Sequence, residues 1–189
     1  MTRVATALVH YPVVDRAGDT ITTAITNLDL HDLSRTACTY GISDLFVVHP
    51  VAAQRELAQR VRDHWVGGSG SRRIPTREPA MRLVRIVSDL AEAVEALGGR
   101  RAVEVYATSA RTRGCSPIGF AQARARLNAN DRTVLMLFGT GWGLAPEALD
   151  GVDVLLAPID GSSASGYNHL SVRAAFAIVL DRLLGPLRA

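Results

Sequence analysis

The chain has 189 residues, of which 48% are hydrophobic and 21% are charged. This is the composition of an ordinary globular protein, and it excludes a disordered or collagen-like chain. The length suits one domain over residues 1–189 with a full hydrophobic core. No apolar run reaches the ~20 residues of a membrane helix, and the N-terminal stretch MTRVATALVHYP lacks the features of a signal peptide. We therefore expect a cytoplasmic protein without a membrane partner.

The formal net charge is +3, and all 21 basic residues are arginine. Arginine pairs with phosphate and stacks on bases, so a local excess of it permits nucleic-acid binding. One short stretch holds six of them: Arg55, Arg60, Arg62, Arg72, Arg73 and Arg77. A solvated helix face followed by a loop explains the same stretch equally well. The two cysteines, Cys38 and Cys115, are too few for a disulfide framework and too isolated for a zinc site.

Short apolar runs alternate with amphipathic segments along the chain. The predicted strands are Arg3–Val9, Asp44–His49, Leu83–Val87, Ala102–Ala107, Thr133–Phe138 and Val152–Ile159. The predicted helices are Leu28–Tyr40, Ala52–Trp65, Asp89–Leu97, Pro117–Leu127 and Pro146–Leu149. Strands that are apolar almost throughout and alternate with helices favour an α/β fold, with a parallel sheet covered by helices on both faces.

Two segments depart from this regular pattern. Gly67–Ser71 is rich in glycine and serine and precedes Arg72 and Arg73, so we predict a mobile basic loop. Asn168–Leu184 is helical in pattern and apolar on nearly every side. Such a helix must be buried against more than one surface, which suggests a subunit interface or an unusual path through the fold, although ordinary packing on the sheet also explains it.

Glycine-rich turns follow the last two predicted strands. Gly139–Gly143 follows one strand and Pro158–His169 follows the next. Ligands of open α/β folds bind at this edge of the sheet, and glycine allows the backbone to approach them closely. Asp160 lies at the ~20-residue spacing of a ribose-binding acid, which raises a nucleotide-binding oxidoreductase as an alternative. The G-x-G-x-G spacing and Trp142 argue against that alternative.

The motifs FGTGWGL and YNHLSVRAAFAIVLDRL resemble those of the SPOUT (SpoU–TrmD) methyltransferases, in particular the small bacterial group of SAM-dependent RNA methyltransferases. The segment TNLDLHDLSRTACTYGISDLFVVHP resembles the first SPOUT motif, and ATSAR at Ala107–Arg111 is also similar. The resemblance implies a C-terminal trefoil knot, S-adenosyl-L-methionine (SAM) as cofactor, a tRNA or rRNA substrate and a homodimer with an active site shared between subunits.

The resemblance also implies which residues bind the cofactor. These are Thr108, Ser109, Gly139, Thr140, Gly141, Gly143, Ile159, Gly161, Tyr167, Asn168, Leu170 and Val172. Arg35 falls where many SPOUT members have a catalytic arginine. Two departures are visible: Asp29 stands where the first motif has asparagine, and Ser171 stands where SpoU-type enzymes often have asparagine. They put a standard ribose 2′-O mechanism in doubt.

The predicted catalytic residues are Arg35, His31, Asp29 and Asp32. His31 and Arg35 are four residues apart and share a helix face, and His31 has the pKa of a general base near neutrality. Asp29 or Asp32 offers an alternative base, and Arg35 would hold a phosphate or developing negative charge. A metal site of Asp29, His31 and Asp32 is disfavoured because the three side chains do not converge. The remaining alternative to an RNA methyltransferase is a non-catalytic module that binds SAM or RNA.

Overall fold

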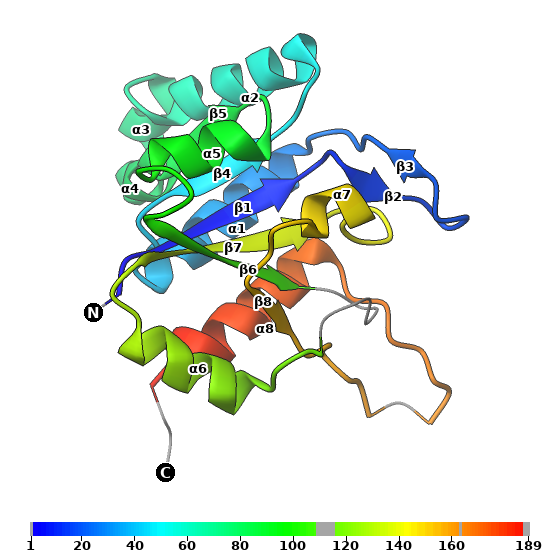
Figure 1. Cartoon of the computed structure of the whole chain (residues 1–189). Coiled ribbons are helices and arrows are strands. Elements are labelled where there is room, and N and C mark those ends of the chain that lie inside the picture. Colours follow the sequence, from blue (N-terminus) through cyan, green and yellow to red (C-terminus); the bar gives the residue numbers. More distant parts are fainter. Residues whose placement is uncertain (1, 109–115, 163, 187–189) are drawn as a thin grey trace.

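The computed structural model describes residues 2–108, 116–162 and 164–186 (Figure 1). Six strands form one sheet in the order β5-β4-β1-β7-β6-β8, and every neighbouring pair is parallel. The strands are β1 (Val4–Val9), β4 (Leu45–Val48), β5 (Val84–Val87), β6 (Val103–Thr108), β7 (Thr133–Gly139) and β8 (Val154–Leu156). The predicted parallel α/β sheet is confirmed, with each strand close to its expected position.

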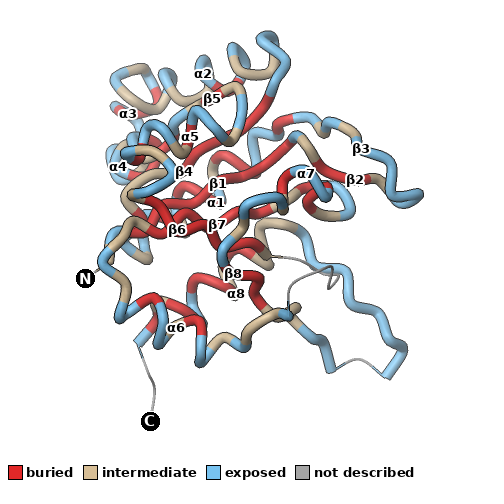
Figure 2. Tube along the Cα trace, viewed as in Figure 1, coloured by how far each residue is buried: buried red, intermediate tan, exposed pale blue. Residues whose placement is uncertain are grey.

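Helices cover both faces of this sheet. The main ones are α1 (Asn27–Thr39), α2 (Ala52–Trp65), α5 (Leu90–Ala96), α6 (Phe120–Ala129), α7 (Pro146–Leu149) and α8 (Val172–Leu184). Apolar side chains of α1, α6 and α8 pack with one set of strand residues, and those of α5 and α7 pack with the other set. The strands alternate accordingly: Met136 of β7 faces α8, whereas Leu135 faces the α5 side. The strands are buried over most of their length in Figure 2.

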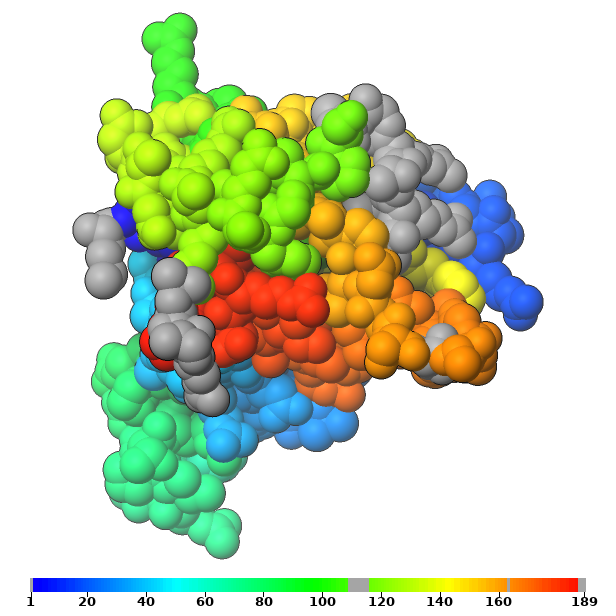
Figure 3. Space-filling model, turned by 90° about the horizontal axis from the view of Figure 1, so that it is seen from below, coloured from blue at the N-terminus to red at the C-terminus, as the bar shows by residue number. Residues whose placement is uncertain are grey.

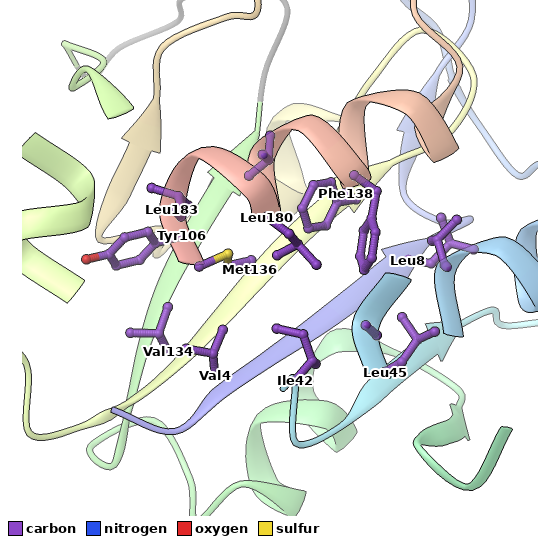
Figure 4. Packing of buried hydrophobic residues seen from close by; sticks show 14 of the residues in the cluster. Val4, Leu8, Ile42, Leu45, Tyr106, Val134, Met136, Phe138, Leu180 and Leu183 are labelled. Carbon is purple, nitrogen blue, oxygen red and sulfur yellow. The ribbon is translucent and has the colours of Figure 1, made fainter. Parts of the chain in front are cut away.

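The C-terminal helix α8 lies on the sheet beside α1 and α6. Figure 4 shows Leu180 and Leu183 of α8 facing Met136, and the rings of Phe138 and Phe176 are 4.6 Å apart. The helix begins at Val172 and not at Asn168 as predicted, because Ser171 caps it by accepting a hydrogen bond from the Ala174 backbone N–H at 3.2 Å. The preceding residues therefore remain in the connection from β8.

The predicted mobile loop at Gly67–Ser71 is wrong, because Ser69–Arg73 forms the short helix α3. Gly70 is buried, and a Cβ atom there would come within 2.7 Å of the Trp65 ring. The glycine is thus required by packing and not by flexibility, while Arg72 and Arg73 are exposed as expected.

Several short elements escaped the sequence analysis. They are the two-stranded ribbon of β2 (Val13–Val14) and β3 (Thr20–Ile21), the 3₁₀ turn η1 (Pro75–Arg77) and α4 (Glu78–Arg82). Within the residues that the structure describes, no helix combines the length and apolar character needed to span a membrane.

Candidate functional site

A cavity of about 650 Å³ opens at the carboxyl ends of the central strands. This volume lies within the range of small-molecule and cofactor sites. Its walls come from the segment after β1, the N-terminal turns of α1 and α8, the glycine turn after β7 and the connection from β8 to α8, all of which lie at the same end of the sheet (Figure 1). Parallel strands of open α/β folds place ligand sites at this edge.

Nine of the twelve predicted cofactor residues line this cavity. They are Thr108, Gly139, Thr140, Gly141, Gly143, Ile159, Asn168, Leu170 and Val172. Gly161 and Tyr167 lie outside the wall, and Ser109 lies outside the described residues. Residues from three distant segments, namely the end of β6, the glycine turn and the connection into α8, are thus brought together, while their role in binding remains a prediction.

The glycine turn Gly139–Gly143 has a backbone path that needs its glycines. Gly141 and Gly143 have φ angles of +60° and +115°, which side chains rarely allow. A Cβ atom on Gly139 would lie 2.7 Å from the Leu144 nitrogen. The turn is anchored to β2 by two hydrogen bonds of 2.9 Å, from the Trp142 N–H to the Val14 carbonyl and from the Val14 N–H to the Gly143 carbonyl.

The connection from β8 to α8 is closed by one side chain. The Asn168 Oδ1 atom accepts a hydrogen bond from the Gly161 N–H at 3.1 Å, and its Nδ2 atom donates to the Ile159 carbonyl at 2.9 Å. Gly161 also fits closely here, since a Cβ atom would lie 3.1 Å from Asn168 Oδ1. Asn168 therefore holds the cavity-lining residue Ile159 in place, and Gly161 acts through this contact.

His10, at the end of β1, provides a neutral polar group in the cavity wall. Its Nδ1 atom is 2.9 Å from the Thr23 hydroxyl, which is 2.5 Å from the Thr140 hydroxyl. Because Thr140 donates its only hydroxyl proton to the Val9 carbonyl, Thr23 donates to Thr140 and His10 Nδ1 donates to Thr23. The Nε2 atom of His10 then carries no proton, and it has no hydrogen-bond partner among the described residues.

The electrostatics of His10 agree with that protonation state. Burial, and next the neighbouring ring of His49, lowers the pKa of His10 from 6.5 to about 4. The two rings are 5.8 Å apart. The imidazole is therefore neutral near pH 7, and its Nε2 atom is left as an unused hydrogen-bond acceptor in the cavity wall.

An ion pair between Arg173 and Asp29 also forms part of the cavity wall. The Arg173 Nη1 atom donates to Asp29 Oδ1 at 2.6 Å, and the Thr26 hydroxyl donates to Asp29 Oδ2 at 2.6 Å. Both Asp29 and Arg173 line the cavity. The Arg173 Nε atom is also 3.5 Å from the Asp32 carboxylate, so Asp32 stands beside this pair. Asp29 and Asp32, two of the four predicted catalytic residues, thus both lie beside Arg173, which was not predicted as a site residue.

The other two predicted catalytic residues lie away from the cavity wall. The His31 Nδ1 atom accepts a hydrogen bond from Arg77 Nη1 at 3.0 Å, and its ring makes an edge contact with Trp65. Burial and the Arg77 charge lower the pKa of His31. The nitrogen facing Arg77 is thus occupied and cannot accept a proton without displacing that side chain. Arg35, one turn further along α1, is exposed and does not line the cavity.

Sequence reasoning missed Arg173 and Thr23 as members of the wall. Arg173 is a charged residue in the first turn of a mostly apolar helix, and that placement was an available signal. Thr23 lies in an irregular segment between β3 and α1, where no pattern indicates a neighbour. Among the described residues no group of three or more His, Cys, Asp or Glu side chains could hold a metal ion.

The chain matches known proteins over nearly its full length. A family model described as SAM-dependent RNA methyltransferase matches residues 3–185. A tRNA (guanine-N(1)-)-methyltransferase of Nitratidesulfovibrio vulgaris is 44% identical over 179 residues, and one of Oleidesulfovibrio alaskensis is 45% identical over 182 residues. Each match covers 95% of this chain but only 41% of the relative, so the chain spans less than half the length of either.

Solved structures with this fold are more distant in sequence. TrmJ from Z. mobilis ZM4 superposes with a TM-score of 0.61 at 20% identity, covering 95% of this chain and 67% of that one. The TrmH/SpoU tRNA modifying enzyme of A. aeolicus gives a TM-score of 0.59 at 12% identity, covering 97% and 75%. The predicted resemblance is confirmed: the chain belongs to the SAM-dependent RNA methyltransferase family and has the fold of the SpoU and TrmH-type members of the SPOUT superfamily.

Proposed function

We propose that the chain binds SAM in the cavity between the turns after β7 and β8 and transfers its methyl group to a tRNA nucleotide in the cytoplasm. The observation that carries this proposal is the cavity itself, which nine residues of the expected cofactor set line in a member of this methyltransferase family. tRNA is favoured over rRNA because the two curated relatives are named for it. The guanine N1 specificity in those names belongs to longer proteins, of which this chain spans 41%.

The cavity suits an adenosine-like ligand in size and chemistry. Its apolar wall includes Phe138, Ile159 and Leu170, while the glycine turn offers main-chain groups at close range. Backbone amides and carbonyls of such turns can hold the edge of an adenine. When bound, SAM supplies the electrophilic methyl group of the reaction. The chain's own residues must then hold the acceptor nucleotide and manage its proton.

Asp29 and Arg173 are the charged side chains best placed for that task. Asp29 is buried and holds Arg173 at the cavity, so the guanidinium is oriented before any ligand arrives. Arg173 keeps 34% of its side chain exposed and can bind a phosphate or a developing negative charge on the nucleotide. Asp32 extends the acidic side of this group and remains a candidate proton acceptor.

We further propose a knotted homodimer in which Arg35 and His31 of one copy act at the cavity of the second copy. Two observations support it. Arg35 is exposed and lies off the cavity of its own chain. Helix α8 lies at the surface between α6 and α1 (Figure 3), and its apolar residues Ala174, Ala177 and Ile178 are only partly buried. A second copy packed there would cover them and bring its α1 close.

The proposed activity is tested by incubating the protein with labelled SAM and bulk tRNA, with rRNA as a parallel substrate. Label in tRNA is the expected result. Label in neither RNA, from a protein that binds S-adenosylhomocysteine, would instead favour the non-catalytic module. A protein that binds neither SAM nor S-adenosylhomocysteine would overturn the proposed cavity assignment.

The shared active site is tested by mixing two inactive variants. The Arg35→Ala variant keeps an intact cavity but lacks the arginine of α1. The Arg173→Ala variant keeps Arg35 but has an altered cavity. Mixed dimers would carry one complete site, so unfolding and refolding the two together should restore about a quarter of the wild-type rate. A mixture as inactive as its components, from a protein that is dimeric by light scattering, would show that both residues act within one chain.

The exposed Arg72 and Arg73 of α3 are proposed to contribute to RNA binding. Both lie on a short helix packed against α2, which carries further arginines. Because phosphate contacts release counterions, Arg72→Gln/Arg73→Gln should reduce the slope of log affinity against log salt by about 2. Filter binding of tRNA at several salt concentrations measures that slope, and an unchanged slope would remove these residues from the interface.

A further inference from the structure

The few Phe, Trp and Tyr side chains of this chain are unevenly placed. There are only ten, and all lie within the described residues. Three of them are exposed: Tyr11, Trp142 and Tyr167. They follow the carboxyl ends of β1, β7 and β8 respectively, so every exposed Phe, Trp or Tyr ring of the described residues lies on a segment at the edge of the sheet where the cavity opens.

Two of these rings are joined by a third aromatic side chain. The His169 ring lies 5.4 Å from the Trp142 ring and 5.2 Å from the Tyr167 ring, in edge-to-face contacts. Trp142 and His169 line the cavity, whereas Tyr167 stands outside its wall. The row Trp142–His169–Tyr167, which we name the aromatic platform, therefore leads from the cavity onto the surface.

Exposing the rings of the platform to water costs free energy unless a ligand covers them. An aromatic side chain can bury 150–250 Å², as a rough range, and gains free energy in proportion to the area removed from water. Here Trp142 is 42% exposed and Tyr167 is 68% exposed. An edge-to-face contact uses at most one face of a ring, so Tyr167 keeps an open face. Clustered exposed apolar groups of this kind mark binding sites.

We propose that the aromatic platform stacks unpaired bases of the RNA beside the nucleotide that enters the cavity. This inference rests on the proposed function and specifies the substrate class as an unpaired loop or end, not a continuous duplex. Proteins read single-stranded RNA by stacking its bases on Tyr, Trp and His. An enzyme that takes a nucleotide out of its stack leaves the neighbouring bases without partners, and the platform lies at the place where they emerge.

The proposal reassigns Tyr167. The family resemblance implies a cofactor residue there, but the side chain lies outside the cavity wall and is among the most exposed apolar side chains. Stacking on RNA requires that exposure, whereas binding adenosine within the cavity would require the ring to turn inward.

The chain provides its own optical probe for the test. Its two tryptophans are Trp65 and Trp142, so Trp65→Phe leaves Trp142 as the single indole. We would titrate this variant with a short oligouridylate, with and without S-adenosylhomocysteine, and follow Trp142 fluorescence. Stacking should quench it saturably, also with the cavity filled, whereas the same oligomer paired with oligoadenylate should not.

Tyr167→Ala in this background should weaken oligouridylate binding about tenfold, the effect of losing one base stack. Its affinity for S-adenosylhomocysteine should remain that of the parent. Leu57→Ala removes another exposed apolar side chain, on α2, and serves as the matched control. Circular dichroism of each variant establishes that the fold is retained.

Three outcomes would overturn the proposal. The oligomer could bind, as judged by anisotropy of a labelled strand, without quenching Trp142. Tyr167→Ala could weaken S-adenosylhomocysteine as much as RNA, which would place Tyr167 in the cofactor site. Trp142 emission could change with protein concentration alone, which would make the surface a contact between copies. Because the RNA titration needs neither cofactor nor turnover, its failure is distinguishable from failure of the proposed function.

Discussion

Arg173, the second residue of α8, and Asp29, in the first turn of α1, form an ion pair with an Nη1–Oδ1 distance of 2.6 Å. The two positions are 144 residues apart in the chain. Their environments differ, because the Asp29 side chain is 7% exposed and that of Arg173 is 34% exposed. The buried Asp29 carboxylate depends on Arg173 to compensate its charge. The Arg173 guanidinium can also contact water and the Asp32 carboxylate.

This asymmetry predicts unequal costs for removing either partner. Arg173→Met leaves a buried carboxylate without its counterion and should lower the free energy of unfolding by about 2 kcal/mol. Asp29→Asn leaves a partly solvated guanidinium and should cost about 1 kcal/mol. Urea denaturation of both variants and of the double variant measures the two costs and their coupling. A larger cost for Asp29→Asn would contradict the role given to burial.

His10 predicts a loss of stability at mildly acidic pH. Its pKa is lowered to about 4 in the folded chain and lies near 6.5 in the unfolded chain. Between these values the unfolded chain binds a proton that the folded chain does not. The stabilisation is therefore complete above about pH 6.5 and is lost as pH falls to about 4, by up to about 3 kcal/mol.

His10→Phe should flatten this part of the profile, measured by urea denaturation at several pH values. His31 and His49, whose pKa values are also lowered, should keep a smaller slope of the same sign in the variant. Asp44 and Asp153, with pKa values below 3.8, lose their contribution only at lower pH. A profile in His10→Phe as steep as that of the wild type would show that His10 is not the main titrating group.

Most of the fold could be predicted because buried parallel strands require continuous apolar runs. The helix Ala52–Trp65 was predicted with its observed bounds, since its ends coincide with changes in pattern. The ribbon of β2 and β3 could not be predicted, because strands of two residues carry no period. It matters for the site nonetheless, since Val14 anchors the glycine turn.

The candidate site could be predicted only where a sequence motif within one segment marks the site residues. The glycine turn and the Asn168 connection are local motifs, and both line the cavity. The His10–Thr23–Thr140 chain joins three segments through side-chain hydroxyls, and no spacing in the sequence reports such a contact. The same limit explains why His31, four residues from Arg35, was not recognised as a partner of the distant Arg77.

Gly70 illustrates how a tertiary contact overrides a compositional signal and predicts a packing defect. A Cβ atom there would lie 2.7 Å from the Trp65 ring and 2.8 Å from the His64 ring. Gly70→Ala should therefore destabilise the chain by roughly 1–3 kcal/mol, as overpacking does. Gly119→Ala is the matched control, because its Cβ would meet nothing within 4 Å. Equal midpoints of thermal unfolding for both variants would mean that α3 shifts away from Trp65 and His64 without a loss of stability.

Substituting Asn168 should lower the affinity for the cofactor because the connection before α8 loses its order. Its two hydrogen bonds, to the Gly161 N–H and the Ile159 carbonyl, close the connection before α8. Asn168→Ala removes both, so a ligand must first order this segment, and the affinity for S-adenosylhomocysteine should fall about tenfold. Calorimetric titration measures the change.

Two further variants separate this mechanism from a general loss of stability. Asn168→Asp keeps the acceptor for Gly161 but loses the donor to Ile159, so its affinity should fall between those of the wild type and Asn168→Ala. Asn128→Ala, the same substitution at an exposed position of α6, should bind as the wild type does. Because the Asn168 side chain bonds only to its own connection among the described contacts, the unfolding midpoint should change little. Undiminished binding by Asn168→Ala would mean that the connection is ordered by other contacts.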